Sequence, residues 1–259
     1  DLQDDIVAQH CFNSGDCPPS RTNESSSAED EQGHGTHVAG IISSSGAVSS
    51  AGFAPDAEII GVRVLNSSGN GTISDMIAGL NWLIANHATL GTDVVNMSLG
   101  DSSQHNTACD AVNVSSANAV NQLDALGVVV IAASGNNAYN AGISSPACLT
   151  KVLSVGASYD SNVGGISWSA CSDASSSATT VTCFTNAGTL LDVIAPGAII
   201  TSSGMGGGTA QMGGTSQASP TVAGVAALLK QADSALTTAQ VRTLLQSTGS
   251  PIHKIGSAT

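Results

Sequence analysis

The stretch that decides the fold is Gly213–Lys230, GGTSQASPTVAGVAALLK. Its glycine pair puts Ser216 at the mouth of a helix, which we predict over Val222–Lys230, and Pro220 suits a first turn, where its missing N–H costs nothing. Ala, Val, Leu and Gly surround this helix, so we expect it to be buried rather than amphipathic. A serine there has free backbone N–H groups and the positive end of the helix dipole beside it, which favours developing negative charge. The same serine also fits an ordinary N-cap, so the choice between a capping and a functional role depends on the other motifs of the chain.

Apolar strands alternate with helices along most of the chain. The predicted strands are 57–65, 92–99, 127–133, 152–157 and 190–195, and the predicted helices are 34–44, 74–86, 108–126, 222–230 and 237–246. Near-continuous Val/Ile strands between helices indicate an α/β fold with a mainly parallel sheet covered on both faces. Residues 1–33 are polar and acidic, and we expect a surface loop there. With no long linker, the sequence predicts a single domain over residues 1–259.

Charge and hydropathy exclude several partners. Lys and Arg total 6 against 19 Asp and Glu, a net charge of −13. Nucleic acids and anionic membranes bind basic surfaces, so neither is an expected partner. No apolar run reaches the ~18 residues that a membrane-spanning helix needs. This acidic net charge is compatible with a secreted protein or with a protein that binds cations.

The cysteines are even in number and lie in polar segments, at Cys11, Cys17, Cys109, Cys148, Cys171 and Cys183. None forms a CxxC pair, so a zinc or iron–sulfur site is not expected. Local pairing would join Cys11 to Cys17 and Cys171 to Cys183 and leave Cys109 for Cys148, among the fifteen connectivities that six cysteines allow. Disulfides form in oxidising compartments, so this pattern also indicates secretion.

Three polar segments rich in glycine carry candidate chemistry. His34 begins the predicted helix in HGTHVAG (34–40), between Gly33 and Gly35, where a general base can face a cleft. As a metal site this pair of histidines lacks the glutamate of HExxH. Asn96–Gly100 and Ala133–Asn136 each follow a strand, and ligands of a parallel sheet bind at the carboxyl ends of its strands. Asn136 is a candidate amide donor to an oxyanion, although Gly-Asn is also a common turn.

Together, in this order, these segments resemble those of the subtilisin-like serine peptidases (subtilases). The matching segments are 34–40, 52–55 with the strand that follows, 96–100, 133–136 and the GTS-x-A-x-P motif at 214–220. The resemblance covers nearly the whole chain. It implies a three-layer αβα domain whose buried helix carries the nucleophile, and an endopeptidase that works by acyl transfer on polypeptide substrates.

The resemblance also assigns roles to residues. Ser216 would attack the scissile carbonyl, His34 would carry the proton, and Asn136 with the Ser216 backbone N–H would hold the oxyanion. The remaining substrate-binding residues would be Ser98, Leu99 and Gly100, which pair with the substrate strand, and Ala133, Ser134, Gly135 and Ser144, which complete the first specificity pocket. No charge lies at these positions, so we predict a neutral or apolar residue before the cut.

The orienting aspartate of the catalytic triad is the main departure. The family carries it in an Asp-Ser/Thr-Gly turn before the histidine motif, and residues 1–33 contain no such turn. Substitutes in principle are Asp4, Asp5, Asp16 and Asp30, none of which follows an apolar strand. We therefore expect the first strand, with its aspartate, and the extreme C-terminal segment to lie outside 1–259. An upstream segment or a cleaved propeptide would be a docked partner. The alternative is a non-catalytic pseudoprotease that binds peptides.

Two further alternatives concern metals and another enzyme class. The chemistry needs no cofactor, but structural calcium is usual in the family; the loop 43–50 lacks Asp and Asn, leaving Asp1 as its candidate ligand. Ser216, Asp233 and His253 follow the chain order of an α/β-hydrolase esterase. This interpretation places both Asp233 and His253 in the last few dozen residues, with no room for strands between them, and it leaves HGTHVAG unexplained.

Overall fold

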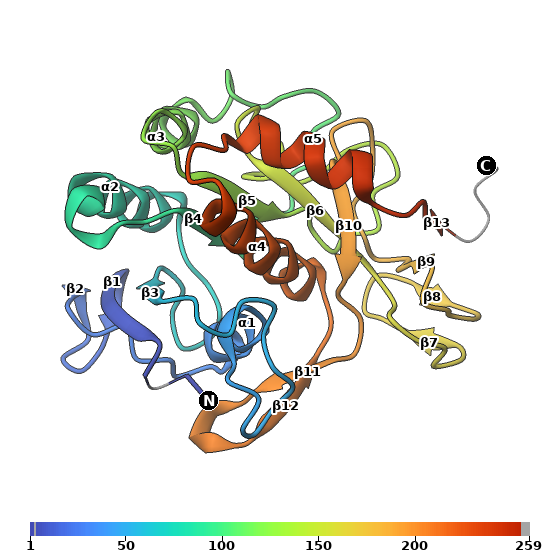
Figure 1. The fold of residues 1–259 in the computed structure, drawn as a ribbon, viewed down its shortest axis with the longest axis horizontal. Coiled ribbons are helices and arrows are strands. Elements are labelled where there is room, and N and C mark those ends of the chain that lie inside the picture. Colours follow the sequence, from blue (N-terminus) through green and yellow to red (C-terminus); the bar gives the residue numbers. More distant parts are fainter. Residues whose placement is uncertain (3, 255–259) are drawn as a thin grey trace.

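The computed structural model describes residues 1–2 and 4–254 (Figure 1). In chain order the strands are β1 (Ile6–Cys17), β2 (Thr22–Ser25), β3 (Ile59–Arg63), β4 (Val94–Met97), β5 (Val129–Ala133), β6 (Leu153–Ser158), β7 (Ile166–Ser167), β8 (Ser172–Asp173), β9 (Thr180–Val181), β10 (Val193–Pro196), β11 (Ile200–Ser203), β12 (Thr209–Met212) and β13 (His253–Lys254). The helices are α1 (His34–Ser43), α2 (Ile73–Leu90), α3 (Val114–Ala125), α4 (Thr215–Ala232) and α5 (Thr238–Thr248), with a 3₁₀ turn η1 (Met205–Gly207).

The larger sheet of the described residues has the order β13–β9–β6–β5–β4, and β10 also pairs with β6. Its central neighbours β4, β5, β6 and β10 run parallel. A separate sheet has the order β2–β1–β3, in which β1 runs parallel to β3 and antiparallel to β2. The predicted mainly parallel α/β architecture is confirmed.

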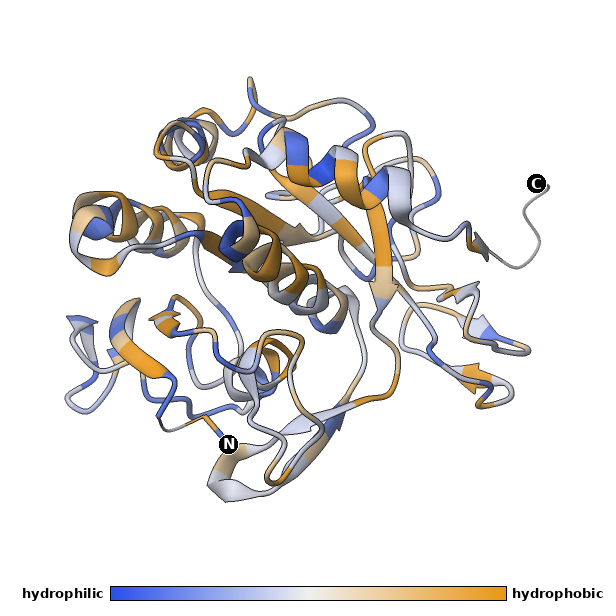
Figure 2. Ribbon diagram, in the orientation of Figure 1, coloured by the Kyte–Doolittle hydropathy of each residue, from blue (hydrophilic) through white to orange (hydrophobic). Residues whose placement is uncertain are grey.

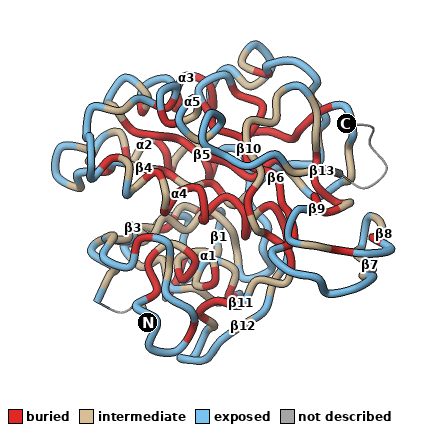
Figure 3. Tube along the Cα trace, turned by 45° about the vertical axis from the view of Figure 1, so that its right-hand side comes forward, coloured by how far each residue is buried: buried red, intermediate tan, exposed pale blue. Residues whose placement is uncertain are grey.

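The strand β5 shows how the layers form. Val129 and Ile131 pack into one core cluster with α4 and α5, whereas Val130 and Ala132 pack into another with α2 and α3. Successive side chains of a strand point to opposite faces of its sheet, so helices cover both faces of this one. Figure 2 shows β5 and β10 as largely hydrophobic, and Figure 3 shows the buried segments gathered around β5 and β6. The sheet is therefore the middle of three layers.

The N-terminal region differs from the sequence prediction. Residues 1–33 were expected as a loop, but β1 and β2 occupy much of this range. The strand β1 is stabilised by pairing with β3, a partner more distant in sequence, and its Ile6 and Val7 remain 46% and 50% exposed. The polar composition of this segment therefore predicted a loop, although β1 is a strand that pairs with the distant strand β3.

The helix predicted over Val222–Lys230 also begins earlier than predicted, at Thr215. Gly214 is its N-cap and Thr215 its first residue, so Pro220 lies inside the helix and not in its first turn. The third helix begins later, at Val114 instead of residue 108. The preceding Cys109 is tied to Cys148 by a disulfide and by the hydrogen bond from its N–H to the Cys148 carbonyl.

The three disulfides are Cys11–Cys17, Cys109–Cys148 and Cys171–Cys183, as local pairing predicted. Within the described part of the chain, no helix combines the length and apolar character needed to cross a membrane.

Candidate active site

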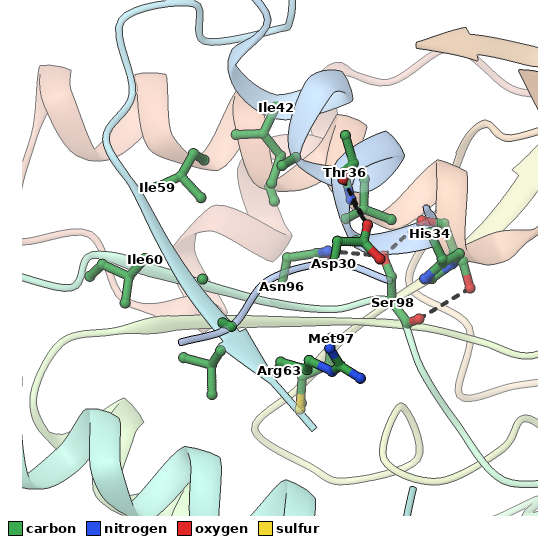
Figure 4. A pocket seen from close by; sticks show the side chains of 18 of the residues that line it. Asp30, His34, Thr36, Ile42, Ile59, Ile60, Arg63, Asn96, Met97 and Ser98 are labelled. Carbon is green, nitrogen blue, oxygen red and sulfur yellow. Dashed lines mark hydrogen bonds between the residues drawn. The ribbon is translucent and has the colours of Figure 1, made fainter. Parts of the chain in front are cut away.

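Asp30 builds the turn that presents His34. One carboxylate oxygen accepts the backbone N–H groups of Gln32 and Gly33, and the other accepts the N–H and hydroxyl of Thr36 (Figure 4). Gly33, the N-cap of α1, has φ 96°, a conformation that glycine adopts without strain. Four donors on one carboxylate hold the pKa of Asp30 below its ordinary value despite its burial. Asp30 thus fixes the entry to α1, a role that the sequence did not indicate.

His34 is half-buried at the first position of α1. Burial lowers its pKa, and so does the neighbouring His37, while the negative charge of Asp30 opposes them. The ring is therefore neutral at neutral pH and able to accept a proton, as a general base must.

His37, the second histidine of the motif, has a structural position. Its side chain is fully buried, and Nε2 donates to the Ile200 carbonyl at 3.0 Å. In return, the Ser202 hydroxyl donates to the His37 carbonyl. These contacts attach α1 to β11.

Ser216 is the second residue of α4, directly after the glycine that caps it. Its hydroxyl donates to the Ser98 carbonyl at 3.3 Å, and the Ser98 hydroxyl donates to the Ser216 carbonyl at 2.7 Å. Pro220 explains the second bond, because it has no N–H to give the carbonyl four residues earlier. Ser98 therefore supplies the donor that Pro220 lacks and joins the end of β4 to the start of α4.

Asn136 follows β5, and its amide is oriented by Thr215. The Asn136 Oδ1 accepts the Thr215 N–H at 2.8 Å and the Thr215 hydroxyl at 2.9 Å. Because a backbone N–H can only donate, the atom facing it must be the oxygen, which leaves the Asn136 NH₂ directed elsewhere. The Ser216 N–H lies in the first turn of α4, where backbone N–H groups have no acceptor within the helix. Two donors of the kind that an oxyanion needs are thus close together.

Most of the predicted site residues line one cavity of about 1800 Å³. They are His34, Ser98, Leu99, Gly100, Ala133, Gly135, Asn136 and Ser216. Ser134 and Ser144 are fully buried and lie behind this lining. The Ser144 hydroxyl donates to the Ser103 carbonyl and accepts from Asn186, so it supports the wall from the rear.

Sequence reasoning missed Asn186, which organises the segment after β5. Its Oδ1 accepts the N–H groups of Asn137 and Tyr139, and its NH₂ donates to Ser144 and to the Asn137 side chain. The residue is fully buried. It lies in a polar stretch without a distinctive motif, so only the folded chain reveals its role.

The four candidate aspartates do not take the place of the triad carboxylate. Asp16 bonds to Arg21, Arg63 and Ser67, and Asp30 is used by its four donors. Asp4 and Asp5 come directly before the amino end of β1. Among the described residues, no carboxylate hydrogen-bonds to the His34 ring.

The residues near Asp1 do not fit the calcium site that is usual in the family. Its carboxylate accepts the N–H groups of Val48 and Ser49 and the Ser49 hydroxyl. Calcium requires oxygen atoms turned toward the ion, whereas this loop turns N–H donors toward the carboxylate. Hydrogen bonds hold the loop in place there.

The esterase alternative fails on geometry. Ser216 lies at the start of α4 and Asp233 is the C-cap at its end. A rise of 1.5 Å per residue separates them by roughly 25 Å.

Comparisons with known proteins identify the family of the chain. The subtilase family model matches residues 2–255. Alkaline elastase YaB of Bacillus sp. (strain YaB) is 39% identical over 221 residues, which are 85% of this chain and 50% of that protein, and Subtilisin Savinase of Lederbergia lenta is 37% identical over 87% of this chain and 73% of that protein. The chain therefore spans about half the length of the elastase.

Solved structures are similar as well. A cold adapted subtilisin-like serine proteinase has a TM-score of 0.70 and 33% identity, covering 91% of this chain and 78% of that one. Sphericase has a TM-score of 0.78 and 26% identity, covering 100% and 82%. Its helices α1 and α4 and its Asn136 line a single cavity, and the family model covers nearly the whole chain: this chain belongs to the subtilase family.

Proposed function

We propose that this chain is the catalytic part of a secreted endopeptidase in which Ser216, His34 and Asn136 perform acyl transfer. The observation that carries the proposal is that these residues, from three separate elements, line one cavity. The neutral ring of His34 and the fixed amide of Asn136 support it further. Secretion is supported by the three disulfides, which persist in oxidising compartments.

In this mechanism the Ser216 Oγ attacks the scissile carbonyl carbon while His34 accepts its proton. The Asn136 NH₂ and the Ser216 N–H donate to the oxygen that becomes negative. The tetrahedral intermediate collapses, the peptide C–N bond breaks, and His34 protonates the leaving amine. Water then attacks the acyl–Ser216 ester with His34 again as base, releasing the acid and restoring the serine hydroxyl.

Substrate would bind as an extended strand beside Ser98–Gly100 and Ala133–Gly135, where glycines allow a close backbone approach. None of these residues is charged. The neighbouring Asp101 carboxylate is used by the N–H groups of Ser103 and Ser145. A neutral or apolar residue before the cut fits this lining. Fastest cleavage after Lys or Glu, in a peptide panel that varies this position, would contradict the specificity.

A fluorophosphonate probe tests the chemistry directly. We expect phosphonylation at Ser216, located by mass spectrometry and absent in Ser216→Ala. His34→Ala should slow it, while His253→Ala should leave its rate unchanged. Labelling at another residue, or a His34→Ala rate equal to wild type, would refute the proposed mechanism.

One observation favours a second candidate, a peptide-binding pseudoprotease: no carboxylate of the described residues orients His34. Loss of the triad aspartate costs on the order of 10⁴ in kcat, because the imidazole is no longer held in the correct tautomer. A chain without this carboxylate would bind peptides without cleaving them at a useful rate.

For the catalytic function we propose that the active form receives this carboxylate from a further segment, and that 1–259 corresponds to the rest of a single peptidase domain.

A further inference from the structure

Trp168 packs against the turn that leads into α4. It follows β7 in the hairpin that β7 forms with β8. A Cβ on Gly213 would lie 2.7 Å from the ring atoms Cζ3 and Cη2 of Trp168, so the ring can lie this close only because residue 213 is a glycine. We call Gly213–Gly214 the entry turn of α4. The indole of Trp168 therefore lies directly on the entry turn.

The entry turn adjoins both groups to which the proposed function assigns the oxyanion. Gly214 is the N-cap of α4, and Ser216 is two residues further on. A Cβ on Gly214 would lie 3.3 Å from the Asn136 Nδ2. Two glycines in succession have more backbone freedom than any other pair of residues, so the position of this turn depends on contacts from outside it. These contacts include the Trp168 ring and the bond from the Gly214 N–H to the Gly197 carbonyl at 2.8 Å.

Buried polar bonds fix the plane of the indole. The Trp168 Nε1 donates to the Tyr159 hydroxyl at 2.9 Å, and that hydroxyl donates to the Asp173 Oδ2 at 2.7 Å. Tyr159 and Asp173 are both buried. Burial, reinforced by the Asp173 carboxylate, raises the pKa of Tyr159 to about 12, so its hydroxyl keeps the proton that it donates. The same Asp173 oxygen accepts the Cys183 N–H at 3.0 Å.

A disulfide and a second ring attach the hairpin to the sheet. Figure 1 shows β7 and β8 side by side at the edge of the molecule, below β9. The Cys171–Cys183 disulfide joins the turn of this hairpin to the segment after β9, and the Cys171 carbonyl accepts the Trp168 N–H at 2.8 Å. Phe184 meets the indole edge to face, with 4.8 Å between ring centroids. The hairpin is thus held where its tryptophan contacts the entry turn.

From these contacts we propose that Trp168 is a positioning residue: it holds the entry turn so that the Ser216 N–H and the Asn136 NH₂ converge on one oxyanion. The β7–β8 hairpin and its disulfide are the support of this residue. The indole lines a separate hollow of about 250 Å³ and acts through Gly213. A misplacement of about 1 Å in a reacting group can cost about 100-fold in rate. The effect on the reaction rests on the proposed function, whereas the hold on the entry turn does not.

Saturation kinetics of Ser216 phosphonylation by a fluorophosphonate test the effect on the reaction. Trp168→Ala should lower the maximal rate constant about 10-fold to 100-fold and change the half-saturating probe concentration by less than about twofold. Trp168→Phe keeps a ring on the turn and should stay within about threefold of wild type. A purely structural role would lower the fraction of chain that is labelled and leave the rate constant unchanged. That result overturns the proposal.

The other tryptophan of the chain is the matched control. Trp82 lies in α2, where its ring stacks on His10. Trp82→Ala should leave the maximal rate constant within about twofold of wild type. A loss as large as that of Trp168→Ala would show that removal of any large ring slows the reaction, and would overturn the proposal.

A double-mutant cycle tests the contact itself. Gly213→Ala places a methyl group where the indole lies, so it should also slow phosphonylation. Because both substitutions disturb one contact, Gly213→Ala/Trp168→Ala should be no slower than the slower single variant. Additive losses overturn the proposal.

Paired cysteine variants test the support. Cys171→Ser/Cys183→Ser should slow the reaction about threefold to tenfold, less than Trp168→Ala, because the polar bonds of the indole remain. Cys11→Ser/Cys17→Ser, which removes the disulfide within β1, should not slow it. Equal rates for these two double variants would refute the role given to the hairpin disulfide.

Amide hydrogen exchange, read by mass spectrometry, separates this proposal from the catalytic one. In Trp168→Ala the amides of residues 213–217 should exchange about tenfold faster or more, while those of β5 and β6 should keep their wild-type rates. Trp168→Phe should keep the wild-type rate in all of these segments, and it serves as the test if Trp168→Ala does not fold by circular dichroism: a wild-type rate constant with faster exchange at 213–217 would then overturn the proposal. Absence of labelling in every form refutes the catalytic proposal and leaves exchange to decide this one. Unchanged exchange at 213–217 in folded Trp168→Ala overturns the positioning role whatever the labelling shows.

Discussion

At the scale of single residues, the site depends on side chains that orient the reacting groups. Thr215 is the clearest case: its N–H and hydroxyl both donate to Asn136 Oδ1, and its hydroxyl accepts the Gly135 N–H. The motif places Thr215 beside the nucleophile, but nothing in the sequence connects it to an asparagine 79 positions earlier.

Thr215→Val should therefore slow Ser216 phosphonylation through Asn136. Asn136→Ala should cost about 10²–10³, the loss known for the equivalent asparagine donor of subtilisin. Thr215→Val should cost less, because one bond from the backbone still holds the amide. In an Asn136→Ala background Thr215→Val should have almost no further effect on the rate. Additive losses in the double variant would show that Thr215 acts independently of Asn136.

Asp30 predicts a pH effect on the neighbouring His34. Burial and the His37 charge lower the His34 pKa, and Asp30 raises it. Asp30→Asn removes the negative charge but keeps an acceptor oxygen, so the His34 pKa should fall further and the acid limb of the labelling rate should move to lower pH. The exposed Glu29→Gln is the matched control, and the measurement is the NMR titration of the His34 ring. A higher His34 pKa in Asp30→Asn would contradict this account.

At the scale of elements, α4 includes a proline that the sequence placed in the first turn. The prediction was wrong for a simple reason. A proline is favourable only where no backbone N–H donor is needed, and in this helix another residue supplies the missing donor. Ser98 donates to the Ser216 carbonyl in place of the missing N–H. A bond between residues 118 positions apart leaves no local signal.

This arrangement predicts a double-mutant cycle in stability. Ser98→Ala should cost about 1–3 kcal/mol, because it leaves the partly buried Ser216 carbonyl without a donor. Pro220→Ala restores an N–H at the right position, so the Ser98→Ala/Pro220→Ala variant should recover part of that loss in urea unfolding. Ser98 also bonds to Asn96 and Ser219, and these losses should persist in the double variant. No recovery would mean that those contacts account for the whole effect.

At the scale of the whole molecule, sequence reasoning predicted the layers better than the edges. Continuous apolar strands such as Val129–Ala133 are buried on both faces, so their pattern is unambiguous. The strand Ile6–Cys17 is polar and partly exposed, and its partner β3 lies far away in sequence, so the same reasoning predicted a loop. The motifs predict His34, Ser216 and Asn136 as site residues, whereas Asp30, Thr215 and Asn186 hold the segments around them through contacts that only the fold creates.

The three disulfides give a whole-molecule prediction, since each constrains the unfolded chain by an amount that rises with the logarithm of the length of the loop it closes. The sequence separations are 39 for Cys109–Cys148, 12 for Cys171–Cys183 and 6 for Cys11–Cys17. Chain entropy then gives losses of about 4, 3 and 2 kcal/mol when each pair is replaced by serine. Urea unfolding of the three paired variants should reproduce this order. The largest loss for Cys11–Cys17 would instead indicate that this bond mainly stabilises the native strand β1, in which both cysteines lie.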